Sequence, residues 1–463
     1  MRRLFLLSLM LVLLAACRKS EFTDSPEARV TTTVDSLHFD TVFTTTGSFT
    51  QAFKIVNKNE KGVRLSSVRL VGGNASPFRI NVDGAPGPQV GDIDISDNDS
   101  VYVFVTVSID PSSSTLPFVV QDSIEINYNG NRQLVQLDAW GQNAHFYRSR
   151  ELTADAVWNN DLPYVIVGGL AVDTGVTLTI NEGCRIYLHA DAPFIVDGTL
   201  KVNGKNWDST RVVFTGDRLD EPYRDFPASH PGLIFTGSSI NNVLNYAVIK
   251  NAYQGIVADR PASNGAPKVT LNEVIVDNIY ETGVLGFNSS ITARNLLLSN
   301  CGRNLYLVNG GKYQFTHATV VSTSNSYVQH KAPVLTALDF IPNNAAAPVA
   351  LDAVFRNCIF WGDGGLVDNE VIVAGRHPSS SVVFEGVLWK VKTPPTAPAT
   401  VIGTPVTQAP VFDSISHGQR IFNYRLKEGS PGVNAGINAG VTLDLDGNPR
   451  PVGLPDLGAY ERQ

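Results

Sequence analysis

Five eight-residue segments in the second half of the chain share one pattern of apolar and polar positions. They begin at residues 244, 271, 293, 315 and 355, and in each the fourth and sixth residues are apolar. These pairs are Ala247 and Ile249, Val274 and Val276, Leu296 and Leu298, Ala318 and Val320, and Cys358 and Phe360. Because alternate side chains of a β-strand share a face, the pattern predicts strands whose apolar pairs point into a common interior.

The spacing of these segments indicates a repeat of short strands. Successive segments start 27, 22, 22 and 40 residues apart (271−244, 293−271, 315−293 and 355−315). A unit of this length without a helical stretch cannot bury its own apolar face, whereas stacked units can, each pairing its backbone with the last at about 4.8 Å. We therefore expect a parallel β-helix over residues 144–425, with the organisation of residues 324–354 left open.

Asparagine closes three of the segments, at Asn251, Asn278 and Asn300. Each follows the last apolar position by two residues, whereas a leucine-rich repeat places its asparagine three residues after that position. Stacked amides can hydrogen-bond to one another and to the turn backbone, so we expect a structural ladder at this corner. The alternative is that these asparagines are present only because asparagine favours turns.

The first third of the chain has a different pattern. Between residues 30 and 143, short alternating runs are separated by turn signals such as Gly-Gly-Asn and Asn-Gly-Asn, which is typical of an antiparallel β-sandwich. The runs are 37–39, 52–56, 68–70, 78–80, 101–109, 123–128 and 133–140. Their order resembles immunoglobulin-like (Ig-like) modules, without the Cys…Trp…Cys pattern of antibody domains. The predicted fold is therefore all-β throughout.

The stretches 176–188, 194–204 and 211–216 also carry a likeness to a known family. Together with the ending Asp-Leu-Asp-Gly-Asn-Pro-Arg-Pro and Pro-Asp-Leu-Gly-Ala-Tyr-Glu, they resemble right-handed parallel β-helix proteins of the bacterial envelope. The resemblance covers about residues 150–463 and implies a right-handed coil with a C-terminal closing segment at 426–463. Because this fold hosts lyases, hydrolases, adhesins and scaffolds, it implies no reaction.

The start of the chain reads as an export signal. Met-Arg-Arg precedes an apolar run at 4–14, too short for a membrane-spanning helix, which needs about 20 residues. Leu14-Ala15-Ala16-Cys17 resembles the lipobox of bacterial lipoproteins, which implies a signal peptide over 1–16, lipidation of Cys17 and a flexible tether over 17–29. An ordinary signal with a chance cysteine is the alternative. The expected location is the outer membrane, at either face.

Charge and cysteine content narrow the set of partners. The chain has 36 basic and 43 acidic residues, and loss of Arg2 and Arg3 with the signal takes the net charge from −7 to −9. Nucleic acid is therefore a poor partner, and the membrane is expected to be reached through the lipid anchor. Three cysteines remain after Cys17, an odd number that argues against a complete disulfide set and favours a core role for each.

We find no motif for catalysis, a metal or a cofactor. The acidic stretch at 92–99 is expected to be a solvated turn, and Asp444 and Asp446 are expected to form a turn rather than a cation site. His317 occupies an outward position of its segment. Three further histidines lie in turn-rich stretches and are expected at the surface: His189, His230 and His377. Catalytic residues stay unknown.

Tyr253 and Tyr280 each stand two residues beyond a ladder asparagine. Successive coils would place the two rings one above the other on the outer wall, as a platform for the apolar face of a sugar; the alternative is that they pack across a loop. The leading hypothesis is a non-catalytic binding or display module for glycan or for another envelope protein. The alternatives are a polysaccharide lyase or glycoside hydrolase acting on an acidic polysaccharide, and a structural envelope protein.

Overall fold

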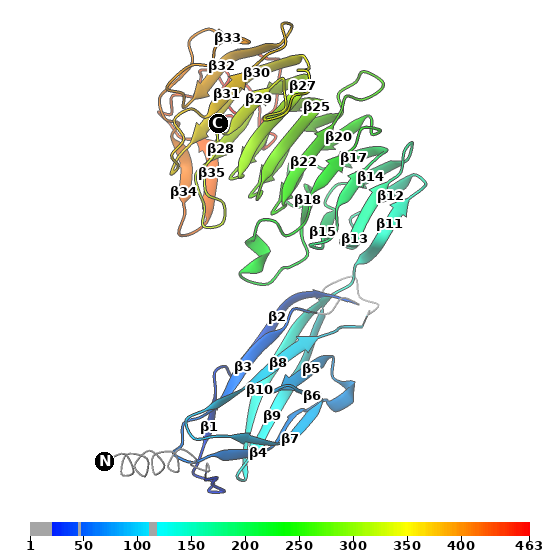
Figure 1. Ribbon diagram of the computed structural model, residues 1–463, viewed down its shortest axis with the longest axis vertical. Helices are drawn as coiled ribbons and strands as arrows, with labels where there is room; N and C mark the ends of the chain where they lie inside the picture. The colour runs from blue at the N-terminus through cyan, green and yellow to red at the C-terminus, as the bar shows by residue number, and fades with distance from the viewer. Residues whose placement is uncertain (1–20, 45–47, 111–117) are drawn as a thin grey trace, which may run out of the picture. The chain divides into compact units, whose positions relative to one another are not determined.

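The computed structural model describes residues 21–44, 48–110 and 118–463 (Figure 1). The predicted signal peptide and Cys17 lie outside the described residues. The chain divides into two units, residues 1–144 and 145–463, at the position where the sequence changes from the sandwich pattern to the repeat pattern. Both units are built almost entirely of β-strands.

The first unit contains two five-stranded sheets that enclose one apolar core. One sheet has the order β1 (Val30–Thr32), β3 (Gln51–Asn57), β8 (Ser100–Val107), β5 (Phe78–Val82) and β6 (Ala85–Gly87). The other has the order β2 (Ser36–Phe43), β10 (Asn131–Gln142), β9 (Phe118–Tyr128), β4 (Val63–Leu70) and β7 (Gln89–Ile95). All pairings are antiparallel except that of β2 with β10. Each of the seven predicted runs overlaps one of these strands, and only the run at 101–109 extends beyond its strand, by two residues.

The acidic stretch at 92–99 was expected to be a solvated turn, and that prediction is wrong for its first half. Residues 92–95 belong to β7, where Ile93 and Ile95 are buried against the core and Asp94 pairs with Arg64 of β4 at 2.6 Å. Alternation of aspartate with isoleucine is a strand signal of period two. The turn begins only after Ile95.

Residues 21–29, the described part of the predicted tether, lie against the first unit. Gly62 donates its N–H to the Glu21 carbonyl (2.8 Å) and accepts the N–H of Thr23 (2.9 Å), and the Asn129 amide also donates to the Thr23 carbonyl (3.0 Å). The Phe22 ring packs on Gly62, where any side chain would collide with it. This segment is therefore anchored to the sandwich.

The second unit is a stack of 23 strands that pair in parallel, a parallel β-helix (Figure 1). Its strands are β11 (His145–Leu152), β12 (Ala156–Trp158), β13 (Tyr164–Val172), β14 (Thr177–Asn181), β15 (Arg185–Leu188), β16 (Phe194–Val196), β17 (Thr199–Asn203), β18 (Val212–Gly216), β19 (Leu233–Phe235), β20 (Asn242–Asn245), β21 (Ala247–Lys250), β22 (Gln254–Asp259), β23 (Val269–Asn272), β24 (Ile275–Asp277), β25 (Thr282–Arg294), β26 (Leu297–Ser299), β27 (Arg303–Thr316), β28 (Thr319–Ser322), β29 (Leu335–Leu338), β30 (Leu351–Gly362), β31 (Val371–Ala374), β32 (Ser381–Trp389) and β33 (Ala399–Ile402).

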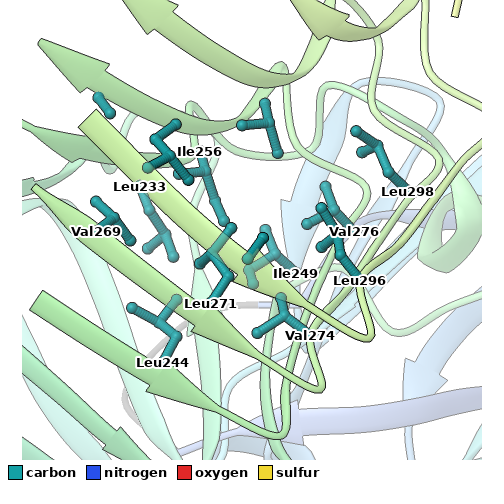
Figure 2. Packing of buried hydrophobic residues seen from close by; sticks show 14 of the residues in the cluster. Leu233, Leu244, Ile249, Ile256, Val269, Leu271, Val274, Val276, Leu296 and Leu298 are labelled. Carbon is teal, nitrogen blue, oxygen red and sulfur yellow. The ribbon is translucent and has the colours of Figure 1, made fainter. Parts of the chain in front are cut away.

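The predicted interior columns are confirmed. Ile249 pairs with Val276, and Val276 pairs with Leu298 (Figure 2). Leu298 in turn pairs with Val320, and none of these side chains is exposed. The fourth positions of the segments are buried as well. The repeat of about 22 residues therefore corresponds to one coil of the helix, with each aliphatic side chain packed on its equivalent in the next coil.

Two corners of the coil depend on single residues in the left-handed region. At the third position of the segments these are Tyr246, Glu273, Asn295, His317 and Asn357, with φ between 47° and 55°. At the eighth position Asn251, Asn278 and Asn300 have φ of 64°, 57° and 51°. Asparagine tolerates this conformation better than most residues, so the turn preference proposed as an alternative also applies here.

The 40-residue step, whose organisation the sequence left open, is one lengthened coil, since Phe315 pairs in register with Phe355. Strand β29 pairs in parallel with β27 and with β31, so the stack continues without interruption. The extra length lies in the loops before and after β29, at residues 323–334 and 339–350. Added residues have thus changed the loops and left the register of the strands intact.

The C-terminal segment covers one flank of the helix. An antiparallel hairpin, β34 (Phe412–Ser416) and β35 (Ile421–Leu426), leads into it, so the covering segment starts earlier than the predicted residue 426. A second apolar core lies between coil and cover, with outward residues of β26, β28 and β30 packed against Tyr424, Leu445 and Leu457. The flank needs this cover because its outward positions are themselves apolar.

Candidate functional site

Tyr253 and Tyr280 form a stacked pair on the outside of the helix. Their ring centroids are 5.6 Å apart with an interplanar angle of 25°, and the residues are 45% and 54% exposed. The backbone joins the two turns, since Tyr280 N–H donates to the Ala252 carbonyl and Glu281 N–H to the Tyr253 carbonyl (both 2.9 Å). The predicted stacking on the outer wall is confirmed, and ligand binding by the pair stays a prediction.

Polar groups surround the tyrosine pair. Gln254 follows Tyr253 and donates its amide to Glu281 Oε2 at 3.2 Å. One coil further, the Arg303 N–H donates to the Glu281 carbonyl (2.6 Å), and its guanidinium lies 5.1 Å from the centroid of the Tyr306 ring. The residues that follow the two tyrosines thus pair an amide with a carboxylate, while the Arg303 guanidinium of the next coil lies over Tyr306.

The asparagine corner is a ladder over two coils. Asn278 Nδ2 donates to Asn251 Oδ1 at 2.8 Å, and both side chains are almost fully buried. Asn300 has other partners: it donates to Asp277 Oδ1 (3.3 Å) and accepts the hydroxyl of Tyr424 (3.0 Å). Hydrogen bonding and the left-handed turn are thus both satisfied by the same residues.

The ladder amides also hold two loops against the coil. Asn251 Nδ2 donates to the Arg224 carbonyl (2.7 Å), and Asn278 Nδ2 donates to the Asp225 carbonyl (2.8 Å). From the other side, Asn325 Nδ2 donates to Asn278 Oδ1 (3.1 Å). The loop around the short 3₁₀ turn η2 (Tyr223–Asp225) and the loop at 323–334 are therefore fixed on one patch of the coil.

These loops and the β34–β35 hairpin enclose a pocket of about 150 Å³ over the ladder, which we call the corner pocket. It is lined by Asp225, Lys250, Asn251, Asp277, Asn278, Asn300, Asn325, Ser326, Tyr327, His417, Arg420 and Phe422. The three predicted ladder residues are among these lining residues. Lys250 and Asp277 are the seventh residues of two repeat segments, and Phe422 lies on β35. The other lining residues come from loops and turns without periodicity, which the repeat pattern does not identify.

Opposite charges face one another in the corner pocket. Arg420 Nη1 donates to Asp225 Oδ2 (2.9 Å), and its guanidinium lies 5.1 Å from the Tyr327 ring. Lys250 and Asp277 are register partners on β21 and β24, and Asp277 Oδ1 accepts the Ser299 hydroxyl (2.6 Å). Burial raises the pKa of Asp277, while the hydrogen bonds and the Lys250 charge act in the opposite direction.

A second asparagine ladder on the coil was missed. Asn272 Nδ2 donates to Asn245 Oδ1, and Asn181 Nδ2 to Asn159 Oδ1, both at 2.8 Å. Asn203 continues this column, because it pairs in register with both Asn181 and Asn245. The signal was present as asparagine at the second position of two segments and at the ends of two earlier strands.

Two histidines expected at the surface are buried, which corrects the prediction. His317 hydrogen-bonds with Asn357 (3.0 Å) and contacts Arg450 beneath the C-terminal cover. His230 Nε2 donates to the Lys250 carbonyl (3.1 Å), and burial lowers its pKa to about 4. The alternation of apolar and polar residues shows which side chains of a strand point outward. It does not show which outward side chains are then covered by other segments of the chain. His189 is at the surface, where it pairs with Asp217 at 2.7 Å.

The remaining predictions about reactive residues concern cysteine and aspartate. Cys184, Cys301 and Cys358 are free and buried, as expected of core residues. Asp444 forms a turn as predicted, since its Oδ1 accepts the N–H groups of Asp446 (2.9 Å) and Asn448 (2.7 Å). Within the described residues, no group of three or more His, Cys, Asp or Glu is arranged to hold a metal ion.

No helix in the described part of the chain has the length and apolar character needed to cross a membrane. Comparison with protein-family profiles and with curated proteins finds no match.

Two of the solved structures that this chain resembles are distant likenesses. A family 123 glycoside hydrolase from Clostridium perfringens is 12% identical over 24% of this chain and 25% of its own, with a TM-score of 0.18. The PapD-like domain 7 of human CEP192 is 13% identical over 28% of this chain and 90% of its own, with a TM-score of 0.17.

Proposed function

We propose that this chain is a lipid-anchored envelope protein that binds or displays glycan on the outer wall of its β-helix without transforming it. The observation that carries the proposal is the exposed, stacked pair of Tyr253 and Tyr280. Two aromatic rings held side by side in solvent present the flat apolar surface on which the C–H face of a sugar packs. The neighbouring side chains of Gln254 and Glu281 supply a donor and acceptors for its hydroxyls.

The backbone supports this role because it fixes the platform before any ligand arrives. Hydrogen bonds between the two turns hold the tyrosines on adjacent coils. A preorganised surface loses little conformational entropy on binding, which raises affinity for a given contact area. The lipid anchor rests on the Leu14-Ala15-Ala16-Cys17 pattern and remains part of the proposal.

The test is retention of the full chain on immobilised polysaccharides, with soluble glycan as competitor. We expect the double variant Tyr253→Ala/Tyr280→Ala to lose most retention, because stacking contributes about 1 kcal/mol per ring. The matched control is Tyr102→Ala/Phe104→Ala, which removes a similarly exposed stacked pair in the first unit. Loss of retention only in the control, or retention by no glycan in a broad panel, would refute the assignment.

Catalysis is the second candidate, and one observation favours it. Asp277, whose pKa is raised by burial, faces the corner pocket together with Lys250, an arrangement suited to proton transfer. Incubation with polymers of uronic acids, monitored for new double bonds and for new reducing ends, tests a lyase and a hydrolase together. Turnover that disappears in Asp277→Asn would replace the binding proposal with an enzymatic one.

A further inference from the structure

We infer that the corner pocket is a second ligand site, which takes a single uncharged sugar unit such as the terminal residue of a glycan chain. The inference rests on the proposed glycan-binding function. It assigns the chain end of a glycan to the corner pocket and leaves the body of the glycan on the tyrosine pair. The tyrosine pair offers an open surface for the face of a sugar, whereas the corner pocket is enclosed on several sides by separate segments. Three properties of the pocket support this assignment.

The first property is size. At about 150 Å³ the pocket is well below the roughly 300–1,000 Å³ typical of sites for drug-sized ligands. One six-membered sugar ring is a ligand of the appropriate scale, and an extended oligosaccharide is not. The site is therefore suited to a chain end or a free monosaccharide.

The second property is the complementary pair formed by Lys250 and Asp277. An ammonium group only donates hydrogen bonds, and an ionised carboxylate only accepts them. In the described part of the chain, no carboxylate lies within 4.0 Å of the Lys250 ammonium, so no direct ion pair competes with a ligand for it. A hydroxyl both donates and accepts, so adjacent hydroxyls of a sugar satisfy Asp277 and Lys250 together.

The balance of charge selects against ionised ligands. A carboxylate or phosphate in the pocket would face Asp225 and Asp277, and an amine would face Lys250 and Arg420. Like charges in a partly desolvated site repel strongly, so either ion is penalised. An uncharged polar ligand avoids both penalties.

The third property is a rigid wall with an aromatic surface. Tyr327 packs on Phe226 with ring centroids 5.0 Å apart and also contacts the guanidinium of Arg420, which is itself paired with Asp225. The Asn278 and Asn325 amides tie the same loops to the coil. The walls are thus formed before binding, and Tyr327 and Phe422 supply apolar contacts for the C–H groups of a ring.

The experiment is saturation-transfer NMR on the full chain with free monosaccharides: glucose, galactose and N-acetylglucosamine as neutral probes, with glucuronate and glucosamine as charged ones. We expect transfer to at least one neutral sugar and weaker transfer to both charged sugars. Lys250→Met and Asp277→Asn should each weaken binding roughly tenfold or more, the range for a lost hydrogen bond to a charged group. Lys201→Met, at an exposed outward lysine of β17, is the matched control and should bind like the unmodified chain.

The outcomes separate the two sites. Monosaccharide binding that persists in Tyr253→Ala/Tyr280→Ala supports the pocket even where that variant has lost its retention on polysaccharide. Retention of polysaccharide without transfer to any monosaccharide overturns the pocket and leaves the tyrosine platform. A clear preference for glucuronate or glucosamine, or binding unchanged in both Lys250→Met and Asp277→Asn, also overturns it.

The folding of the variant is checked separately. Lys250→Met removes a partly exposed side chain, so the melting temperature of this variant should match that of the unmodified chain. A matching melting temperature rules out misfolding as the cause of weaker binding.

Discussion

Asn278 illustrates how one residue type meets several requirements of a tight corner. Its φ of 57° suits asparagine, its amide donates to Asn251 and to the Asp225 carbonyl, and its oxygen accepts from Asn325. Turn preference and hydrogen bonding, posed as alternatives from the sequence, operate together. A residue chosen for either reason alone would leave the other requirement unmet.

We therefore predict that Asn278→Leu destabilises the second unit by about 1–3 kcal/mol for its orphaned partners, with about 1–2 kcal/mol more for the left-handed backbone. Urea unfolding measures the change. Asn278→Gly is the matched control, because glycine accepts the backbone conformation and loses only the amide. If neither Asn278→Gly nor Asn278→Leu lowered the free energy of unfolding, the amide would have no stabilising role at this corner.

His230 provides a pH-dependent term in stability. Its pKa is about 4 in the folded chain against an ordinary value of 6.5, so between these values the unfolded chain binds the extra proton. The neutral His230 side chain therefore contributes its full share to the free energy of unfolding above pH 6.5. As the pH falls from 6.5 towards 4, the free energy of unfolding decreases by up to about 3 kcal/mol.

Denaturant unfolding of the native chain and of His230→Gln at pH 7, 5.5 and 4.5 measures this term. Glutamine keeps an N–H for the Lys250 carbonyl and does not titrate, so the two free energies of unfolding should be similar at pH 7, and the native chain should lose stability relative to the variant as the pH falls to 4.5. Parallel pH profiles would contradict the assignment of a buried neutral imidazole.

At the scale of elements, the repeat strands were predictable and the loops were not. Alternation in five short segments was sufficient to place Ile249, Val276 and Leu298 in one column, because a strand has only two faces and a stack has only one interior. Loops carry no such period. Asp225, Tyr327 and Arg420 all line the corner pocket, although 195 residues separate Asp225 from Arg420. No local sequence pattern predicts contacts between residues so far apart in the chain.

The interior columns should dominate the stability of the helix. Leu298 is fully buried among its equivalents, and we predict that Leu298→Ala costs about 2–5 kcal/mol through lost burial and a cavity. Leu366, which is fully exposed, is the matched control, and Leu366→Ala should change the free energy of unfolding by less than about 0.5 kcal/mol. Similar effects at both positions would mean that Leu298 is not a core residue.

At the scale of the whole molecule, the two units could be predicted because their hydrophobic patterns differ. Alternating runs with polar turns predicted the sandwich, and the boundary near residue 144 follows from the change to a repeat. His317 is buried beneath the C-terminal segment, where it contacts Arg450, more than 100 residues later in the chain. The pattern of strands gives no information on where that segment folds back, so the burial of His317 could not be predicted.

The proposed anchor is a property of the whole molecule and has its own test. In a Gram-negative host we expect the full chain in the membrane fraction, carrying the mass of a lipid group at Cys17. Cys17→Ser should move the protein to the soluble fraction. Cys184→Ala, at a buried thiol of the second unit, should stay with the membrane. Membrane association retained by Cys17→Ser would exclude a lipid anchor at this residue.

The loops on either side of β29 have a practical consequence. They lengthen one coil, yet β29 still pairs with β27 below and β31 above. Loop length and strand register are thus separable in this scaffold. Binding specificity can diverge by insertion while the core sequence stays fixed, and the exposed stretch at 342–347 is a natural acceptor for a grafted peptide epitope.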